Sequence, residues 1–119
     1  MPLSTQPSLD GLTFRLHSST TSKVDPDSPS TFHYRERDGV VWGDYDGDTV
    51  TFGRFIGTRE GDGISVRFVH VLAATGNVIT GQGTSAIERD AATDTLRLIE
   101  HYEMHGAPQR SVCVQVPGA

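Results

Sequence analysis

The sequence has little cysteine, few apolar residues and no excess of basic residues. One of its 119 residues is Cys, so Cys113 has no partner for an internal disulfide. Apolar residues make up 35% of the chain, and no apolar run approaches the roughly 20 residues that a membrane-spanning helix needs. The first ten residues are polar and lack the basic and apolar segments of a signal peptide. We therefore expect a cytoplasmic protein that does not bind a membrane.

The shortage of basic residues also bears on partners. Ten Lys and Arg stand against 15 Asp and Glu, which gives a net charge of -5 and a pI near 5.4. The basic residues are scattered along the chain, so no continuous basic surface is predicted. Nucleic acid is not an expected partner.

Glycine and short β-favouring runs are abundant. The chain has 13 Gly, and its β-favouring runs alternate with turn signals every 8–12 residues or so, a spacing typical of a barrel or sandwich. We predict an all-β domain at 11–117: an antiparallel up-and-down meander of about eight strands that forms a small closed or nearly closed, calycin-like barrel. A flexible N-terminus at 1–10 precedes it, and a Pro/Ser-rich loop lies at 18–30. The expected strands are Leu12–Ser18, Thr31–Arg37, Val40–Tyr45, Thr49–Thr58, Ile64–Ala73, Val78–Glu88, Thr95–Met104 and Arg110–Val116.

Two Asp-Gly dipeptides, at 38–39 and 46–47, predict which side chains face the interior. Such dipeptides favour two-residue type I′ hairpins, and the loop length then determines the register. The predicted pairs are Arg37 with Val40 and Tyr45 with Asp48. The more apolar face, assigned to the interior, holds Phe32, Tyr34, Val41, Tyr45, Val50, Phe52, Arg54 and Ile56. The opposite face holds His33, Arg35, Val40, Trp42, Asp44, Thr51 and Phe55. A three-residue loop would invert half of this assignment.

Alternation carries the interior face into the next two strands. In the run from Ile64 to Ala73 the even positions are expected to point inward, and they include His70. A two-residue loop at Gly76-Asn77 would then place Gly83 opposite His70, and Gly81 opposite Leu72. The interior wall beside His70 would be bare backbone.

The strand at 95–104 adds an ionisable group to this interior. Its inward set is Leu96, Leu98, Glu100, Tyr102 and Met104. Because an unpaired carboxylate is costly to bury, Glu100 requires a partner. Arg54, His70 and bound water are the candidates.

An eight-strand barrel can hold one small ligand or be filled by its own side chains. The leading hypothesis is a barrel that binds a small, partly apolar molecule in its interior. The predicted ligand-binding residues are Tyr34, Tyr45, Phe52, Arg54, Phe68, His70, Gly81, Gly83, Glu100 and Tyr102.

Two alternatives stay open. A small barrel enzyme, such as a cyclase, isomerase or dehydratase of a hydrophobic metabolite, would use His70 and Glu100 as catalytic residues for proton transfer. A filled barrel, whose polar groups satisfy one another, would be a structural or interaction protein.

Three motifs that resemble metal or cofactor sites are better explained by strands and turns. His101 and His105 lie too far apart on a strand to share a metal, and 44–48 lacks the Gly and Glu positions of a calcium loop. The glycines of 81–86 are not followed by a crossover helix, so a dinucleotide site is not expected. We predict neither a metal nor a cofactor.

The predicted outer face is also apolar. A contiguous apolar patch usually marks an interface, so a homodimer is expected. The residues assigned to its interface are Trp42, Phe55, Val69 and Val71.

Between Thr13 and Met104 the order of short motifs resembles a family of small uncharacterised bacterial proteins often labelled "N-acetylglutamate synthase". The motifs are Phe32-His33-Tyr34, Val41-Trp42, Phe52-Gly53, Ile56-Gly57, Arg67-Phe68-Val69-His70 and Thr80-Gly81. That label implies acetyl transfer from acetyl-CoA to glutamate. The resemblance also implies an all-β meander, similar in general look to lipocalin and avidin barrels, although the lipocalin Gly-x-Trp opening is missing. It carries no catalytic residue over to this chain.

Overall fold

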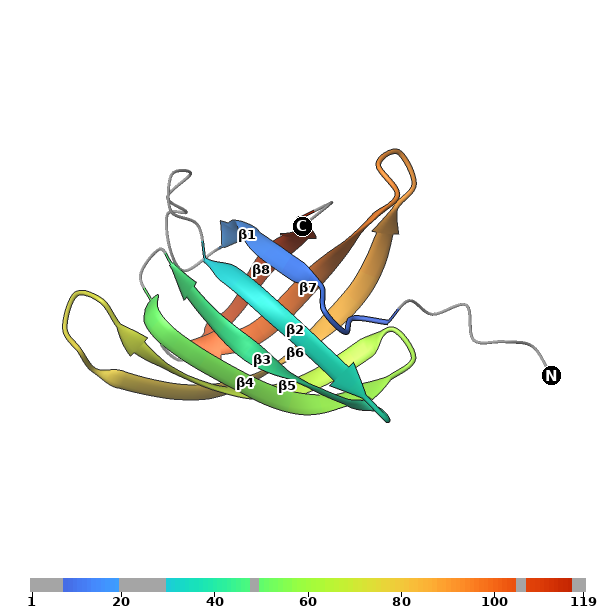
Figure 1. The fold of residues 1–119 in the computed structure, drawn as a ribbon. Helices are drawn as coiled ribbons and strands as arrows, with labels where there is room; N and C mark the ends of the chain where they lie inside the picture. The colour runs from blue at the N-terminus through green and yellow to red at the C-terminus, as the bar shows by residue number, and fades with distance from the viewer. Residues whose placement is uncertain (1–7, 20–29, 48–49, 105–106, 117–119) are drawn as a thin grey trace.

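The computed structural model describes residues 8–19, 30–47, 50–104 and 107–116, which form a closed eight-strand barrel. Each strand pairs antiparallel with the next along the chain, and the last strand pairs with the first, as Figure 1 shows. The predicted fold class is confirmed. The strands are β1 (Thr13–Ser19), β2 (Thr31–Arg37), β3 (Val40–Gly47), β4 (Val50–Glu60), β5 (Gly63–Leu72), β6 (Val78–Asp90), β7 (Thr95–Met104) and β8 (Ala107–Gln115).

The first Asp-Gly turn behaves as predicted. Asp38 and Gly39 both have positive φ, 51° and 79°, as a type I′ turn requires. Arg37 pairs with Val40, so β2 and β3 stand in the expected register. Tyr34 and Val41 are accordingly buried.

The second Asp-Gly turn does not close the β3–β4 hairpin as predicted. Tyr45 pairs with Gly53 instead of Asp48, and Gly47 pairs with Val50. The pairings of β4 with β3 and with β5 both shift register between Val50 and Gly53. One extra residue near Thr51 therefore forms a β-bulge, which reverses the inward and outward alternation of the strand beyond it.

Because of the bulge, four of the side-chain orientations predicted for β4 are wrong. Val50 is buried as expected, but Phe52 and Ile56 point outward and are 52% and 59% exposed. Arg54 is also exposed, with its guanidinium 4.2 Å from the centroid of the Phe52 ring. Phe55, predicted to point outward, is 7% exposed and belongs to the core.

The β5 face is confirmed, whereas the predicted β5–β6 register is wrong. Ile64 and His70 are buried, as the alternation predicts. His70 pairs with Ile79, not Gly83, and Phe68 pairs with Gly81. The backbone N–H of Gly76 donates to the carbonyl of Leu72, so the loop is longer than two residues. The shift is an even number of residues, which leaves the inward face of β6 unchanged.

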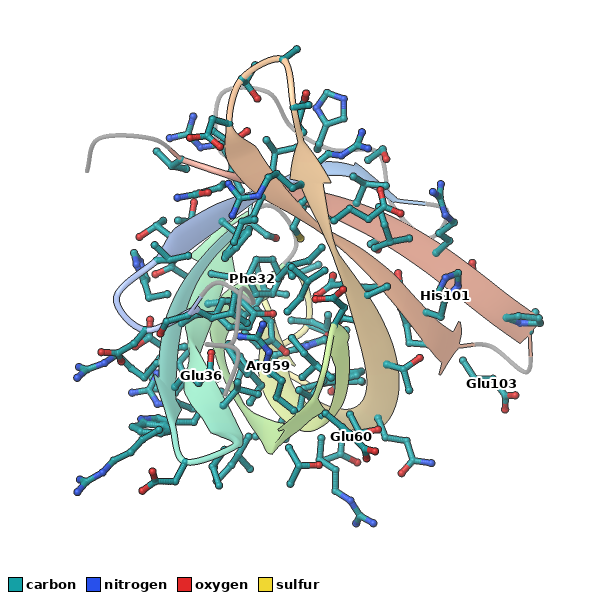
Figure 2. All side chains as sticks on the ribbon, turned by 90° about the vertical axis from the view of Figure 1, so that its right-hand side faces the viewer. Phe32, Glu36, Arg59, Glu60, His101 and Glu103 are labelled. Carbon is teal, nitrogen blue, oxygen red and sulfur yellow. The ribbon has the colours of Figure 1, made fainter. Side chains whose placement is uncertain are left out.

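One end of the barrel is closed by a buried ion pair and by the chain ahead of β1. Arg59 Nη1 lies 2.7 Å from Glu36 Oε1, and their side chains are 6% and 17% exposed. Figure 2 labels the two residues next to each other at the end of the barrel that faces the viewer. The backbone N–H of Leu9 donates to the same carboxylate oxygen at 2.9 Å, and Leu9 is fully buried. This end is therefore plugged.

The predicted N-terminus at 1–10 and loop at 18–30 are described only in part. Residues 1–7 and 20–29 lie outside the described residues. Ser18 and Ser19 belong to β1, and Ser30 is buried. Within the described ranges, no helix is long and apolar enough to span a membrane.

Candidate functional site

The interior surface contributed mainly by β1–β4 is aromatic. We call Phe14, Phe32, Tyr34, Tyr45 and Phe55 the aromatic wall. Tyr34 packs on Phe14 and Phe55 with ring centroids 5.2 and 4.6 Å apart, and Phe32 stacks on Tyr45 at 4.8 Å. These contacts join strands β1 to β4 into one packed layer.

Glycines make room for these rings. A Cβ atom on Gly53 would lie 2.6 Å from Tyr45 Cε2, and one on Gly43 would lie 2.7 Å from Phe55 Cζ. A Cβ atom on Gly81 would likewise lie 2.9 Å from Cε1 of the Phe68 ring. The space that the sequence suggested for a ligand at Gly81 is therefore occupied by Phe68.

The facing interior surface, on β6–β8, carries polar side chains beside the buried Ile87, Leu96 and Leu98. We call Ser85, Glu100, Tyr102, Ser111 and Cys113 the polar wall. Ser85 and Ser111 flank Glu100 in the β6–β7 and β7–β8 pairings. Tyr102 Oη lies 3.1 Å from Ser111 Oγ, and Cys113 Sγ donates to Glu100 Oε1 at 3.5 Å. Strand alternation puts all five side chains on the inner face.

Burial raises the pKa values of ionisable groups in and near the polar wall. Loss of hydration raises the pKa of Glu100 from 4.5 to about 7, and the hydrogen bond from Cys113 offsets only part of that rise. Burial and the nearby Glu100 charge also raise the pKa of the Cys113 thiol well above its usual value. The pKa values of Tyr34 and Tyr45 are raised by the same two causes. At neutral pH the thiol and both phenols are therefore uncharged, while Glu100 is divided between its two forms.

His70 is held by the aromatic wall. Its Nδ1 lies 2.7 Å from Tyr45 Oη, and its ring is parallel to that of Phe68 at 5.7 Å. Burial lowers the pKa of His70 below 6.5, so the imidazole is neutral at physiological pH.

Most of the predicted ligand-binding residues do face the interior. Tyr34, Tyr45 and His70 are buried, and Phe68 packs against the core. Gly81, Gly83, Glu100 and Tyr102 lie on inward positions of β6 and β7. Phe52 and Arg54 point outward because of the β4 bulge. The pairing of Arg54 with Glu100 that the sequence suggested therefore does not form.

The predicted proton-transfer pair does not form a contact. Among the described residues, His70 hydrogen bonds to Tyr45 and Glu100 to Cys113, with no interaction between the two. A direct exchange of a proton between His70 and Glu100 is not supported by this geometry, because proton transfer requires hydrogen-bond reach.

Three residues of the polar wall were not predicted as site residues from the sequence. Ser85, Ser111 and Cys113 are not among the ligand-binding residues predicted from the sequence. No local signal places Ser111 inward, because alternation along the last strand would assign the apolar Val112, Val114 and Val116 to the interior. In the described part of the chain, no three His, Cys, Asp or Glu side chains gather as metal ligands would.

The outer face of the barrel carries a separate feature, which we call the outer groove. It has a volume of about 720 Å³ and crosses β3–β6. Its outward-facing lining residues are Trp42, Arg54, Ile56, Arg67, Val69, Thr80 and Gln82.

The comparison with protein families agrees with this architecture. Residues 7–116 match the family model described as "Avidin-like protein". The chain belongs to the avidin-like family. No curated protein matches the chain, and no solved structure does. Membership supports a barrel that binds small molecules. The resemblance to proteins labelled "N-acetylglutamate synthase" stays a prediction.

Proposed function

We propose that this avidin-like barrel binds one small, partly apolar molecule between the aromatic wall and the polar wall. The observation that carries the proposal is Glu100, an inward-facing carboxyl group whose one described side-chain partner is the weak donor Cys113. Its surface and that of Tyr102 stay partly accessible, although both face the interior. Convergent polar groups beside an apolar surface are the usual composition of a ligand site.

The aromatic wall supplies the apolar side of the proposed site. Phe32 and Phe68 are only partly buried where they pack against the core cluster. Both rings stand on inward positions of β2 and β5, where an apolar ligand in the interior would contact them. Burial of such surface contributes roughly 25 cal/mol per Å² to the free energy of binding.

Binding without turnover is the form of the proposal that the geometry favours. A carrier needs the polar anchors and apolar surface described above, whereas the enzyme alternative needs His70 and Glu100 in reach of each other. The absence of a described contact between them favours the carrier.

The proposal is tested by titrating isotope-labelled protein with a library of small molecules, biotin included because avidin-like proteins bind it. Amide shifts at Phe68, Glu100 and Tyr102 are expected for a ligand in the interior. As a matched pair, Ser85→Leu fills the interior face of β6, and Thr84→Leu adds the same side chain to the exposed face. Binding lost only in the Ser85 variant supports the proposal. Ligands that shift only outer-face amides would contradict it, as would a library without binders.

A second copy of the chain is the proposed occupant of the outer groove. Ile56 and Val69 expose apolar surface there, while Phe55, assigned to the interface from the sequence, is buried in the core. The same face carries both Asp44 and Arg67. Two copies related by a two-fold axis present this patch to each other, so opposite charges can pair across it.

Sedimentation velocity tests the homodimer. We expect a dimer for the natural chain, a monomer for Ile56→Asp, and a dimer for the control Thr84→Asp, which changes an exposed residue outside the groove. A natural chain that stays monomeric at high concentration would overturn this proposal.

A further inference from the structure

The barrel interior holds several ionisable side chains, and most of them are uncharged near pH 7. Its inward-facing ionisable residues include Tyr34 from β2, Tyr45 from β3, His70 from β5, Glu100 from β7 and Cys113 from β8. The phenols and the thiol are neutral at physiological pH, and so is the imidazole. Glu100 is therefore the one group in this set that takes a charge near pH 7, and that charge is negative.

The inward-facing cation of the described residues is paired with another carboxylate. Arg59 is the inward-facing guanidinium of the described residues, and it is tied to Glu36 at the plugged end. Figure 2 shows both side chains at that end of the barrel. The other described arginines are on the outer face, where Arg54 and Arg67 line the outer groove. No cation from the described residues reaches Glu100.

Aromatic faces add to the preference for a positive charge. The faces of Tyr and Phe rings carry negative potential and attract cations within about 6 Å. Tyr34 and Tyr45 lie close enough to Glu100 for its charge to raise their pKa values. Because Tyr34 and Tyr45 are covered by neighbouring rings, the partly buried rings of Phe32 and Phe68 are the ones that a bound cation would contact.

We propose that the interior ligand is a small organic cation, an amine, amidine or guanidine with an apolar body, and that Glu100 is its counter-ion. This inference rests on the proposed function, since it names the class of molecule that the same site takes. The charged nitrogen would hydrogen bond to the carboxylate, and the apolar body would lie against Phe32 and Phe68. A charge-assisted hydrogen bond of this kind is stronger than one between neutral groups.

Binding of a cation would be coupled to release of a proton. Half of the Glu100 side chains are protonated near pH 7, the value to which burial raises the pKa. The cation binds the ionised form, so its affinity should rise as the pH rises through 7. Between pH 8 and pH 6 we expect a loss of about tenfold in affinity.

Three probes of one shape test the inference: benzamidine, which is cationic, benzamide, which is neutral, and benzoate, which is anionic. For the natural chain at pH 8 we expect benzamidine to bind about tenfold more tightly than either of the others. Glu100→Gln keeps the size of the side chain and removes its charge, so it should abolish that preference. The control Glu103→Gln makes the same change on the exposed face of β7, where Figure 2 shows Glu103 outside the barrel.

The outcomes separate this inference from the proposed function. Equal affinity for the three probes, tighter binding of benzoate, or an unchanged preference in Glu100→Gln would overturn the cation inference. In those cases amide shifts at Phe68 and Tyr102 would still support a ligand in the interior. If no molecule of any charge shifts the inward-facing amides, both proposals are wrong.

Discussion

The aromatic wall and the polar wall follow the same strand alternation, yet they use their inward positions differently. On the aromatic wall, large rings pack on one another, and glycines such as Gly43 and Gly53 on neighbouring strands give the rings space. On the polar wall, serines and Cys113 surround a single carboxyl group without offering it a cation. The aromatic wall therefore stabilises the barrel. The polar wall carries a carboxyl group that would gain a partner when a ligand binds.

Two phenylalanines of β4, one on each face of the sheet, should differ most in what they contribute to stability. Phe55→Ala removes a ring from the aromatic wall, and Phe52→Ala removes the same ring from the outer surface of β4. Phe55→Ala should lower the free energy of unfolding by about 3–5 kcal/mol because it leaves a cavity in the core. Phe52→Ala should change it by less than about 1 kcal/mol. Urea denaturation measures both, and equal effects would mean that the β4 bulge is wrongly placed.

The polar wall should instead show stability that depends on pH. The pKa of Glu100 is raised on folding, so the folded chain binds more protons than the unfolded chain between pH 4.5 and 7. Its contribution to stability is complete below pH 4.5 and is lost as the pH rises through 7. Glu100→Gln should therefore be about 3 kcal/mol more stable than the natural chain at pH 8, with little difference at pH 4. Denaturation across this pH range measures the effect, and a constant difference would contradict the burial of Glu100.

A smaller effect tests the space that glycine gives to the rings. Gly43→Ala would bring a methyl group against the carbonyl oxygen of His33 and the ring of Phe55. We expect a loss of about 1–3 kcal/mol, typical of overpacking. Gly63→Ala is the matched control, since its Cβ would have Glu60 O as nearest neighbour at 3.5 Å. Thermal unfolding of the two variants should differ clearly, and similar midpoints would argue against tight packing at Gly43.

The hydrogen bond between Tyr45 of the aromatic wall and His70 should contribute less to stability than the packing of the rings. Tyr45→Phe keeps the ring and removes the hydroxyl group, which leaves Nδ1 of His70 without its partner. The cost should be about 1 kcal/mol. Titration of the His70 ring protons by NMR tests the second consequence: burial keeps the pKa below 6.5 in both proteins, because it is the cause of the shift. A value at or above 6.5 would show that His70 is more solvated than the structure indicates.

Local sequence signals predicted the parts of the barrel in which strand alternation is unbroken. The Asp38-Gly39 turn placed Tyr34 and Val41 inside, and the even positions of β5 placed His70 inside. Both predictions rest on the two-residue period of a strand, which a sequence displays directly. They failed on β4 beyond Thr51, where a single extra residue reversed the period and no turn residue marks the change.

By itself the sequence determined an all-β barrel, since turn residues and alternating runs act between neighbours along the chain. It also indicated that Glu100 would be inside and would need a partner. Only the tertiary structure decided that Arg54 lies outside and that Phe68 fills the space beside Gly81. It also decided that Cys113 from a neighbouring strand is the group that reaches Glu100. Those outcomes depend on register between strands and on the bulge, and both follow from the packing of the whole barrel.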